Sequence, residues 1–145
     1  MVSSKLHKLR SLSASEWSLL LLSVFMLPLI AMLVRFSGYN RTKALLNKCI
    51  STRSGHDNLQ QAGSDQAYSI ARMVSVASRY GPWRANCLKQ SLLLWWLLAR
   101  RGLESEIRFG VWKEAEEDFE AHAWVEFNGF NLCDSDILQQ KFRRL

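Results

Sequence analysis

The sequence predicts an α+β fold in which helices come first along the chain and an antiparallel sheet follows. Apolar residues recur at helical spacing up to Gly102. In residues 107–111 the pattern changes to alternation of apolar and polar residues, which is typical of a half-buried strand. Asn128-Gly129 then separates two stretches of strand character and indicates a β-hairpin. Helices followed by such an antiparallel meander favour an α+β domain.

The N-terminal part is unusually apolar. Residues 1–16 are polar and basic, whereas residues 19–34 are interrupted only by Ser23 and Pro28. The apolar run is slightly shorter than the ~20 residues of a spanning helix, and basic residues flank both sides, so charge gives no orientation. Pro28 is expected to kink this helix or divide it in two. Because a small chain cannot cover a helix that is apolar all round, we expect residues 17–36 to lie against a membrane surface or a partner protein, with a transmembrane span as the alternative.

The middle of the chain predicts two further helices and a linker. Residues 40–50 form a basic helix with a few apolar positions, and residues 51–64 have no apolar period and contain turn-forming residues. Asp65 is expected to cap a third helix. The chain thus divides into an N-terminal part (1–50), a linker (51–64) and a C-terminal domain (65–145).

A fourth predicted helix begins at a cysteine. Asn86 is a favoured N-cap residue, and Arg100-Arg101-Gly102 forms a basic last turn followed by a C′ glycine. Cys87 therefore falls in the first turn, where the helix dipole and free backbone N–H groups favour an anion. A thiol in this position loses its proton more easily than one in a core, and is a better nucleophile.

The C-terminal part predicts three strands around an acidic loop at 113–118. The second strand covers residues 119–127 and the third covers residues 130–134. Side chains alternate between the two faces of a strand. One face of the second strand should therefore carry Ala121, Ala123, Val125 and Phe127, and the other should carry His122, Trp124 and Glu126.

Composition excludes several classes of function. The net charge is +6 and 48% of the residues are hydrophobic, but the basic residues are spread along the chain, which argues against nucleic-acid binding. The three cysteines have no paired spacing, which favours a reducing, cytoplasmic setting over a disulfide framework. A zinc site from Cys87, His122 and Cys133 lacks a close-spaced ligand pair. We therefore expect no metal and no other cofactor.

Three residues could together form a nucleophilic site. Cys87 would be the nucleophile, His122 the base that takes its proton and returns it to a leaving amine, and Asp134 the carboxylate that orients the imidazole. A hairpin can present His122 and Asp134 side by side, and the helix start can point Cys87 at them. Taken singly, each residue also has a simpler role: His122 as a structural histidine, Asp134 as a turn cap, and Cys87 as a small buried hydrophobe.

The register of the hairpin tests this hypothesis. A two-residue Asn128-Gly129 loop pairs position 123 with position 134 and puts His122 and Asp134 on opposite faces. A three-residue loop or a bulge shifts the register by one residue and brings them to the same face. We therefore predict an Asn128-Gly129-Phe130 loop or a bulge, and a regular two-residue turn would count against the triad.

The tryptophans supply candidate substrate contacts. Six tryptophans are present, and most have the spacing of core residues. Trp83, Trp112 and Trp124 are close enough in the predicted fold to Cys87 and His122 to line a peptide-binding groove.

Several short segments together resemble one enzyme family. They are Pro82-Trp83-Arg84-Ala85-Asn86-Cys87-Leu88, Leu97-Leu98-Ala99-Arg100-Arg101-Gly102-Leu103, Arg108-Phe109-Gly110-Val111, Ala121-His122-Ala123-Trp124-Val125-Glu126 and Cys133-Asp134. Over roughly residues 65–136 the chain resembles the transglutaminase-like leader peptidases of lasso-peptide biosynthesis. The segment around His122 alone is shared across the wider papain and transglutaminase-like superfamily.

The resemblance implies a papain/transglutaminase-like core and a cysteine protease. In such an enzyme Cys87 is the nucleophile, His122 the general base and Asp134 the orienting carboxylate. The implied substrate is a ribosomally made lasso-peptide precursor, whose leader is removed so that an asparagine-synthetase-like macrolactam cyclase can close the ring. A separate small leader-recognition protein is the further implied partner.

Two other functions stay open. The same three residues suit acyl transfer to an amine, as in a transglutaminase or amidase. A catalytically inactive scaffold in a membrane-associated maturation complex, attached through residues 17–36, is the alternative from another class.

Overall fold

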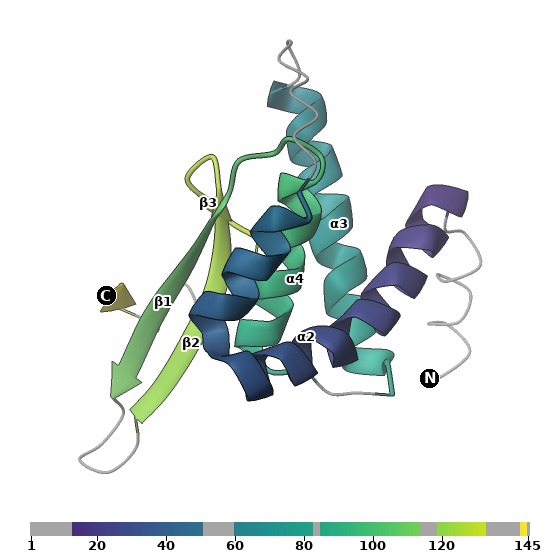
Figure 1. Cartoon of the computed structure of the whole chain (residues 1–145). Coiled ribbons are helices and arrows are strands. Elements are labelled where there is room, and N and C mark those ends of the chain that lie inside the picture. The colour runs from purple at the N-terminus through teal and green to yellow at the C-terminus, as the bar shows by residue number, and fades with distance from the viewer. Residues whose placement is uncertain (1–12, 51–59, 83–84, 114–118, 133–142, 145) are drawn as a thin grey trace, which may run out of the picture.

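The computed structural model describes residues 13–50, 60–82, 85–113, 119–132 and 143–144 (Figure 1). These residues form, in chain order, α2 (Ala14–Lys48), α3 (Gln60–Tyr80), α4 (Cys87–Ala99), β1 (Glu106–Lys113), β2 (Phe119–Phe127), β3 (Phe130–Asn131) and β4 (Arg143–Arg144). The strands make one antiparallel sheet in the order β3-β2-β1-β4. In Figure 1, α4 lies between the sheet and α3, and the second half of α2 crosses in front of α4. The predicted α+β class is confirmed.

Helix α4 is the centre of the core and is defined at both ends by local signals. Asn86 caps its start from an extended conformation. At its end Gly102 takes a left-handed φ of 72°. The N–H of Leu103 bonds to the carbonyl of Leu98 and that of Gly102 to Ala99, both at 3.0 Å, which is a Schellman motif. Between these ends nearly every side of the helix is buried. Its buried residues are Ser91, Leu92, Leu93, Leu94, Trp96, Leu97 and Leu98.

Helix α2 is interrupted at a residue other than the one predicted. Its start carries a capping box formed by Ser13 and Glu16. The break in helical geometry is at Gly38, with φ 75° and ψ 171°, whereas Pro28 lies within the helix. Positive φ costs glycine little because it has no Cβ, while proline already has a helical φ and removes one N–H donor. The prediction that the chain would divide at Pro28 is therefore wrong.

The three helices share one hydrophobic core. Leu19, Leu27 and Ile30 from the first half of α2 are 8%, 2% and 0% exposed, and they belong to the same buried cluster as α3 and α4. The chain thus covers one face of its longest helix without a partner. By length and composition α2 is also the one helix among the described residues that could cross a membrane.

Helix α3 begins earlier than predicted. Its first residue is Gln60 rather than Asp65, so residues 60–64 of the predicted linker are helical. Gln and Ala are good helix formers, and helicity there does not need the apolar period that residues 51–64 lack. The remaining residues of that linker, 51–59, lie outside the described part of the chain. The division into an N-terminal part and a C-terminal domain stays a prediction.

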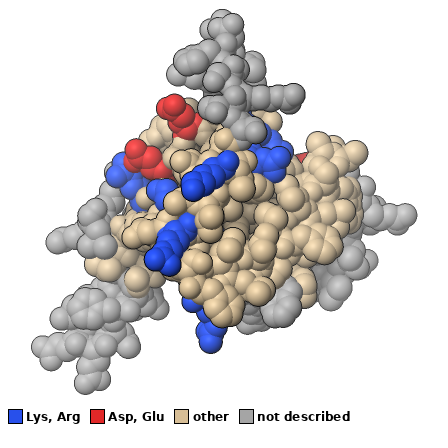
Figure 2. All heavy atoms as spheres, viewed as in Figure 1, with Lys and Arg blue, Asp and Glu red and all other residues tan. Residues whose placement is uncertain are grey.

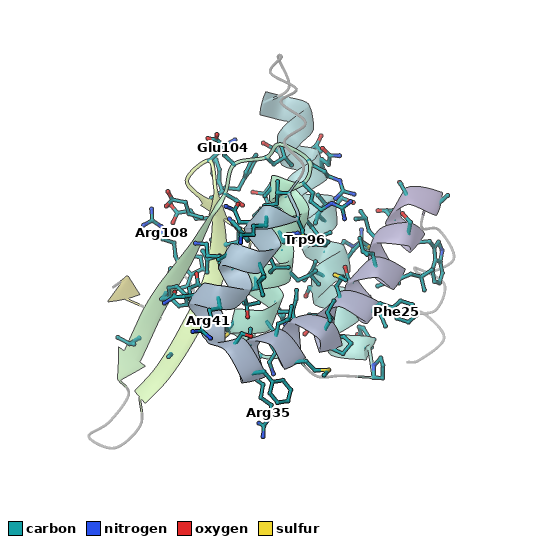
Figure 3. The ribbon with its side chains drawn as sticks, in the orientation of Figure 1. Phe25, Arg35, Arg41, Trp96, Glu104 and Arg108 are labelled. Carbon is teal, nitrogen blue, oxygen red and sulfur yellow. The ribbon has the colours of Figure 1, made fainter. Side chains whose placement is uncertain are left out.

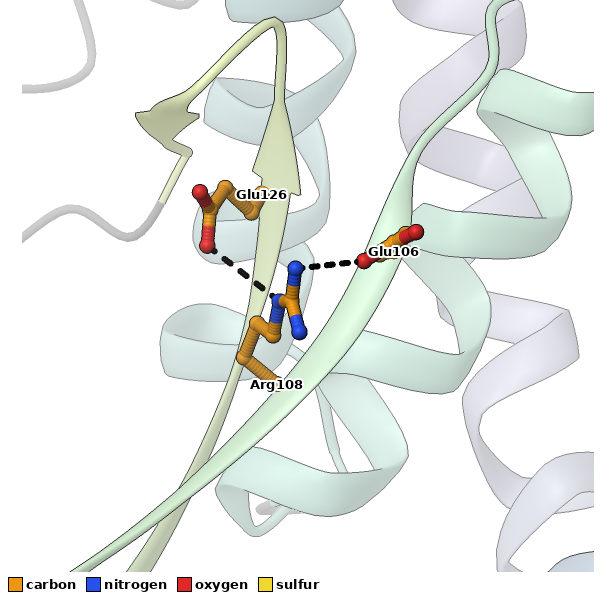
Figure 4. A network of polar contacts seen from close by, with 3 residues as sticks. All are labelled: Glu106, Arg108 and Glu126. Carbon is orange, nitrogen blue, oxygen red and sulfur yellow. Dashed lines mark ion pairs between the residues drawn. The ribbon is translucent and has the colours of Figure 1, made fainter. Parts of the chain in front are cut away.

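The central strand pair is held in register by a small charge network on one face of the sheet. Position 108 pairs with Trp124 across β1 and β2. The Arg108 guanidinium lies 2.7 Å from a carboxylate oxygen of Glu106 and 3.4 Å from one of Glu126 (Figure 4). Arg108 and Glu106 are both well exposed, so the expected contribution to stability is only about 0–1 kcal/mol per pair. The network's structural effect is to favour one alignment of the strand that carries His122.

The turn between β2 and β3 corrects the predicted loop. Phe127 pairs with Phe130, so Asn128 and Gly129 alone connect the two strands. Their φ values are 49° and 80°, as a type I′ turn requires at both central positions. The predicted three-residue loop is therefore wrong, and the pairing of the described residues up to Leu132 contains no bulge. Asn and Gly both accept the left-handed conformation, and the twist of a type I′ turn matches that of the strands.

Candidate active site

The thiol of Cys87 is placed by the cap of α4. The Asn86 side-chain oxygen accepts a hydrogen bond of 3.2 Å from the Lys89 N–H, which fixes the first turn of the helix. Cys87 is the first helical residue and is half-buried. The N–H groups of a first turn lack intrahelical acceptors and carry the positive end of the helix dipole. The local structure therefore favours a negative charge at the sulfur, as the sequence predicts.

The sulfur lies beside the edge of β2 that pairs with β3, beyond the last described pairing between the two strands. β3 pairs only with Glu126 and Phe127, and the N–H of Leu132 extends the pairing to the carbonyl of Val125. Odd-numbered residues of β2 thus direct their N–H and C=O groups toward this edge. Further along the same edge, the Cys87 Sγ lies 4.0 Å from the carbonyl oxygen of Ala121. The thiol is therefore within reach of a backbone carbonyl on this edge of β2.

His122 is the principal partner of the thiol. A hydrogen bond with the His122 side chain is the largest cause of a lowered pKa for Cys87, and the positive charge of the imidazolium adds to it. Burial acts in the opposite direction, because it disfavours the charged thiolate. The backbone N–H groups of Ala123 and Leu88 also donate to the sulfur and lower the pKa. The arrangement is that of a thiol next to an imidazole that lowers its pKa, which favours an activated nucleophile.

Trp124 supports the imidazole on the same face of β2. The two rings are stacked, with centroids 6.1 Å apart and an interplanar angle of 18°. Trp124 itself is only 7% exposed. A buried neighbour of this size limits the orientations that the His122 ring can adopt beside Cys87.

A cavity of about 280 Å³ opens beside the thiol. Cys87, His122 and Trp124 are among the residues that line it. The rest of the lining comes from α3, α4 and the neighbouring hairpin: Ala71, Val74, Ser75, Arg79, Gln90, Ser91, Leu94, Ala123, Val125 and Leu132. Its volume lies at the lower end of the range of ligand pockets, so it suits one or two side chains of a substrate.

The comparisons with known proteins agree with this geometry. A family model described as the transglutaminase-like superfamily matches residues 30–145. The chain belongs to the transglutaminase-like superfamily. No curated protein and no solved structure matches the chain. The superfamily includes cysteine peptidases and transglutaminases, both of which use an activated cysteine, and the fold and the Cys87–His122 pair agree with that membership.

A supporting polar network in this superfamily domain was not predicted from the sequence. The Gln90 Nε2 donates to the Ser78 Oγ of α3 and, at 3.2 Å, to the carbonyl oxygen of Ala85. The Ser78 hydroxyl also donates to the Ala85 carbonyl, at 3.4 Å. These bonds connect α3 and α4 to Ala85, which lies two residues before Cys87 in the segment that leads into α4. The available signal was a glutamine one helical turn after Cys87, in a helix otherwise almost entirely apolar.

The remaining predicted site residues are not placed. Asp134 and Trp83 lie outside the described residues. Trp112 is part of β1, but its side chain is not described. Within the described part of the chain no group of three or more His, Cys, Asp or Glu side chains could hold a metal ion.

The observed turn bears directly on Asp134. In the register of the Asn128-Gly129 turn, position 134 would oppose position 123 and lie on the other face from His122. The described pairing ends before that position. A regular continuation of β3 would therefore separate Asp134 from the imidazole, and the orienting role of Asp134 rests on the resemblance alone.

Proposed function

We propose that this protein is a cysteine peptidase that removes the leader from a ribosomally synthesised lasso-peptide precursor in the cytoplasm. The observation that carries the proposal is that Cys87 and His122 line one cavity at the start of α4, where the His122 side chain lowers the pKa of the Cys87 thiol. The match to the transglutaminase-like superfamily supports this class of chemistry. The assignment of the substrate rests on the sequence resemblance. The proposed partners are the precursor, a small leader-recognition protein and an asparagine-synthetase-like cyclase.

The first half of the proposed reaction forms an acyl-enzyme. The Cys87 thiolate attacks the scissile carbonyl carbon, and the electrons of the C=O bond move to its oxygen. The N–H of Cys87, at the start of α4, is the proposed first donor to this oxyanion. The tetrahedral intermediate collapses, the C–N bond breaks, and the His122 imidazolium gives its proton to the leaving amine. The amine is the new N-terminus of the core peptide, and the leader stays attached to Cys87 as a thioester.

The second half releases the leader. His122, now neutral, takes a proton from a water molecule as that water attacks the thioester carbonyl. The C–S bond then breaks, the leader leaves with a new carboxylate, and the thiolate–imidazolium pair is restored. Asp134 is proposed to hold the imidazole tautomer through both halves.

The decisive experiment mixes the purified full chain with precursor and leader-recognition protein and follows the products by mass spectrometry. Cys87→Ala is expected to abolish cleavage, because loss of a nucleophile typically costs about 10⁴-fold or more. Cys49→Ala is the matched control, since Cys49 is exposed and remote in sequence from the site, and it should retain wild-type activity. Cleavage that persists in Cys87→Ala would refute the proposal.

Acyl transfer uses the same acyl-enzyme and differs only in what resolves it. An added primary amine in the same assay separates the two activities. A peptidase releases the leader as its acid, whereas a transferase releases the leader as an amide 
of the added amine. A folded wild-type protein that cleaves nothing and forms no acyl-enzyme would instead favour the inactive scaffold.

A further inference from the structure

The first half of α2 exposes a row of large apolar side chains that the active site does not use. The row recurs every three or four residues, so its members share one side of the helix. They are Trp17, Leu21, Phe25, Leu29, Met32 and Phe36, and we call them the outer face of α2. Phe25 and Phe36 are 72% and 78% exposed. A contiguous apolar surface of this kind marks an interaction site.

The opposite side of the same helix is already occupied by protein. Leu27 and Ile30 are almost fully buried in the core. Ser23, which is also buried, donates its hydroxyl hydrogen to the Leu19 carbonyl at 2.7 Å and so presents no free polar group. The helix is therefore apolar on both sides, with one side against α3 and α4 and the other against solvent.

The charges at the two ends of the outer face differ: Glu16, which belongs to the capping box, precedes Trp17, and basic residues follow Phe36. Residues 17–34 contain no charged side chain, and no acidic residue occurs between Trp17 and Lys48. Arg35 is exposed at the C-terminal end of the outer face, and Arg41 is exposed beyond the break in α2 at Gly38. Figure 2 shows a broad uncharged surface over this helix, with basic side chains at its border, and Figure 3 shows Phe25 and Arg35 extending from α2 away from the other helices.

We propose that the outer face of α2 docks on the surface of an anionic phospholipid bilayer, with the helix lying in the plane of the interface. The apolar row would enter the boundary between headgroups and acyl chains, and Arg35 and Arg41 would meet lipid phosphates. A membrane crossing would need lipid on every side of the helix and would pull Leu27 and Ile30 out of the core. The family match begins at residue 30, so most of the outer face lies before it. This inference is independent of the proposed peptidase activity.

The test is flotation of the purified full chain with vesicles. Vesicles of phosphatidylcholine and phosphatidylglycerol should carry the protein upward, and vesicles of phosphatidylcholine alone should carry less of it. Phe25→Ser and Phe36→Ser should each weaken partitioning by about tenfold or more, because each removes a large apolar side chain from the lipid contact. The matched control is Phe130→Ser, at the start of β3, where the ring is 64% exposed, and its partitioning should be unchanged. Circular dichroism checks that all variants are folded.

Several results would overturn the docking proposal. Absence of flotation with either vesicle type would refute it, as would equal flotation of wild type and Phe25→Ser. A dimer by analytical ultracentrifugation that is lost in Phe25→Ser, without vesicle binding, would assign the outer face to a second copy of this chain. Resistance of the bound protein to extraction by alkaline carbonate would replace peripheral docking with a membrane span.

Discussion

The surroundings of Cys87 and the outer face of α2 differ in how far their side chains find partners within the protein. Around Cys87 the important groups are polar and satisfy one another: the imidazole of His122 and the N–H groups of Ala123 and Leu88 all interact with the sulfur. Along the outer face of α2, rings such as that of Phe25 are largely exposed to solvent. In the first region the polar groups of the described residues interact with one another. The second is energetically incomplete until something apolar covers it.

The two regions also differ in their position relative to the stretch that matches the superfamily model. The Cys87 site lies wholly within the stretch that matches the superfamily model, whereas most of the outer face precedes that stretch. Both regions nevertheless share one core, because Leu19, Leu27 and Ile30 pack with the helices that position the thiol. Substitutions in α2 should therefore affect stability or docking, and substitutions at the site should affect chemistry.

The largest expected effect tests whether the site extends beyond the Cys87–His122 pair. If Asp134 orients the imidazole, Asp134→Asn should lower kcat/KM by about 10²–10⁴-fold with an unchanged circular dichroism spectrum. Asp136→Asn, two positions later, is the matched control and should have little effect. The assay is precursor cleavage followed by mass spectrometry. Equal activity of the two variants would remove Asp134 from the site, in agreement with the face that the observed turn register would give it.

The next prediction compares how substitutions on the two sides of α2 change the free energy of unfolding of the protein. Ile30→Ala should lower the free energy of unfolding by about 2–5 kcal/mol, because it leaves a cavity in a fully buried position. Phe25→Ala should change it by no more than about 0.5 kcal/mol, since the ring makes little contact with the rest of the protein. Urea unfolding followed by far-ultraviolet circular dichroism measures both. Similar losses at the two positions would show that the outer face is packed in solution and would contradict its assignment as a docking surface.

The smallest expected effect concerns the pH dependence of the thiol. His122 lowers the pKa of Cys87, so the wild-type thiolate persists to lower pH than it would without the imidazole. In a Cys49→Ser, Cys133→Ser background, the rate of alkylation by iodoacetamide should therefore fall at a lower pH in the His122-containing protein than in His122→Ala. His56→Ala is the matched control and should leave the profile unchanged. Coincident profiles for His122 and His122→Ala would mean that the hydrogen bond does not activate the thiol.

Much of the architecture could be predicted from the sequence where the deciding interactions are local. The Asn86 cap, the left-handed Gly102 and the bounds of β2 agree with the sequence pattern, because capping, positive φ and side-chain alternation depend on a few neighbouring residues. The same reasoning could have predicted the two-residue turn. The expectation of a longer loop was wrong because it gave the proposed meeting of His122 and Asp134 priority over the strong local preference of Asn128-Gly129 for a type I′ turn.

The sequence by itself determined an activated position for one cysteine, a helix too apolar to be left in water, and the order of helices and strands. The tertiary structure decided what these features meet. It placed the Cys87 sulfur beside the Ala121 carbonyl of β2, linked Gln90 to Ser78, and determined which side of α2 is buried. These outcomes depend on contacts between residues far apart along the chain. No local pattern encodes them, because they follow from how whole elements pack.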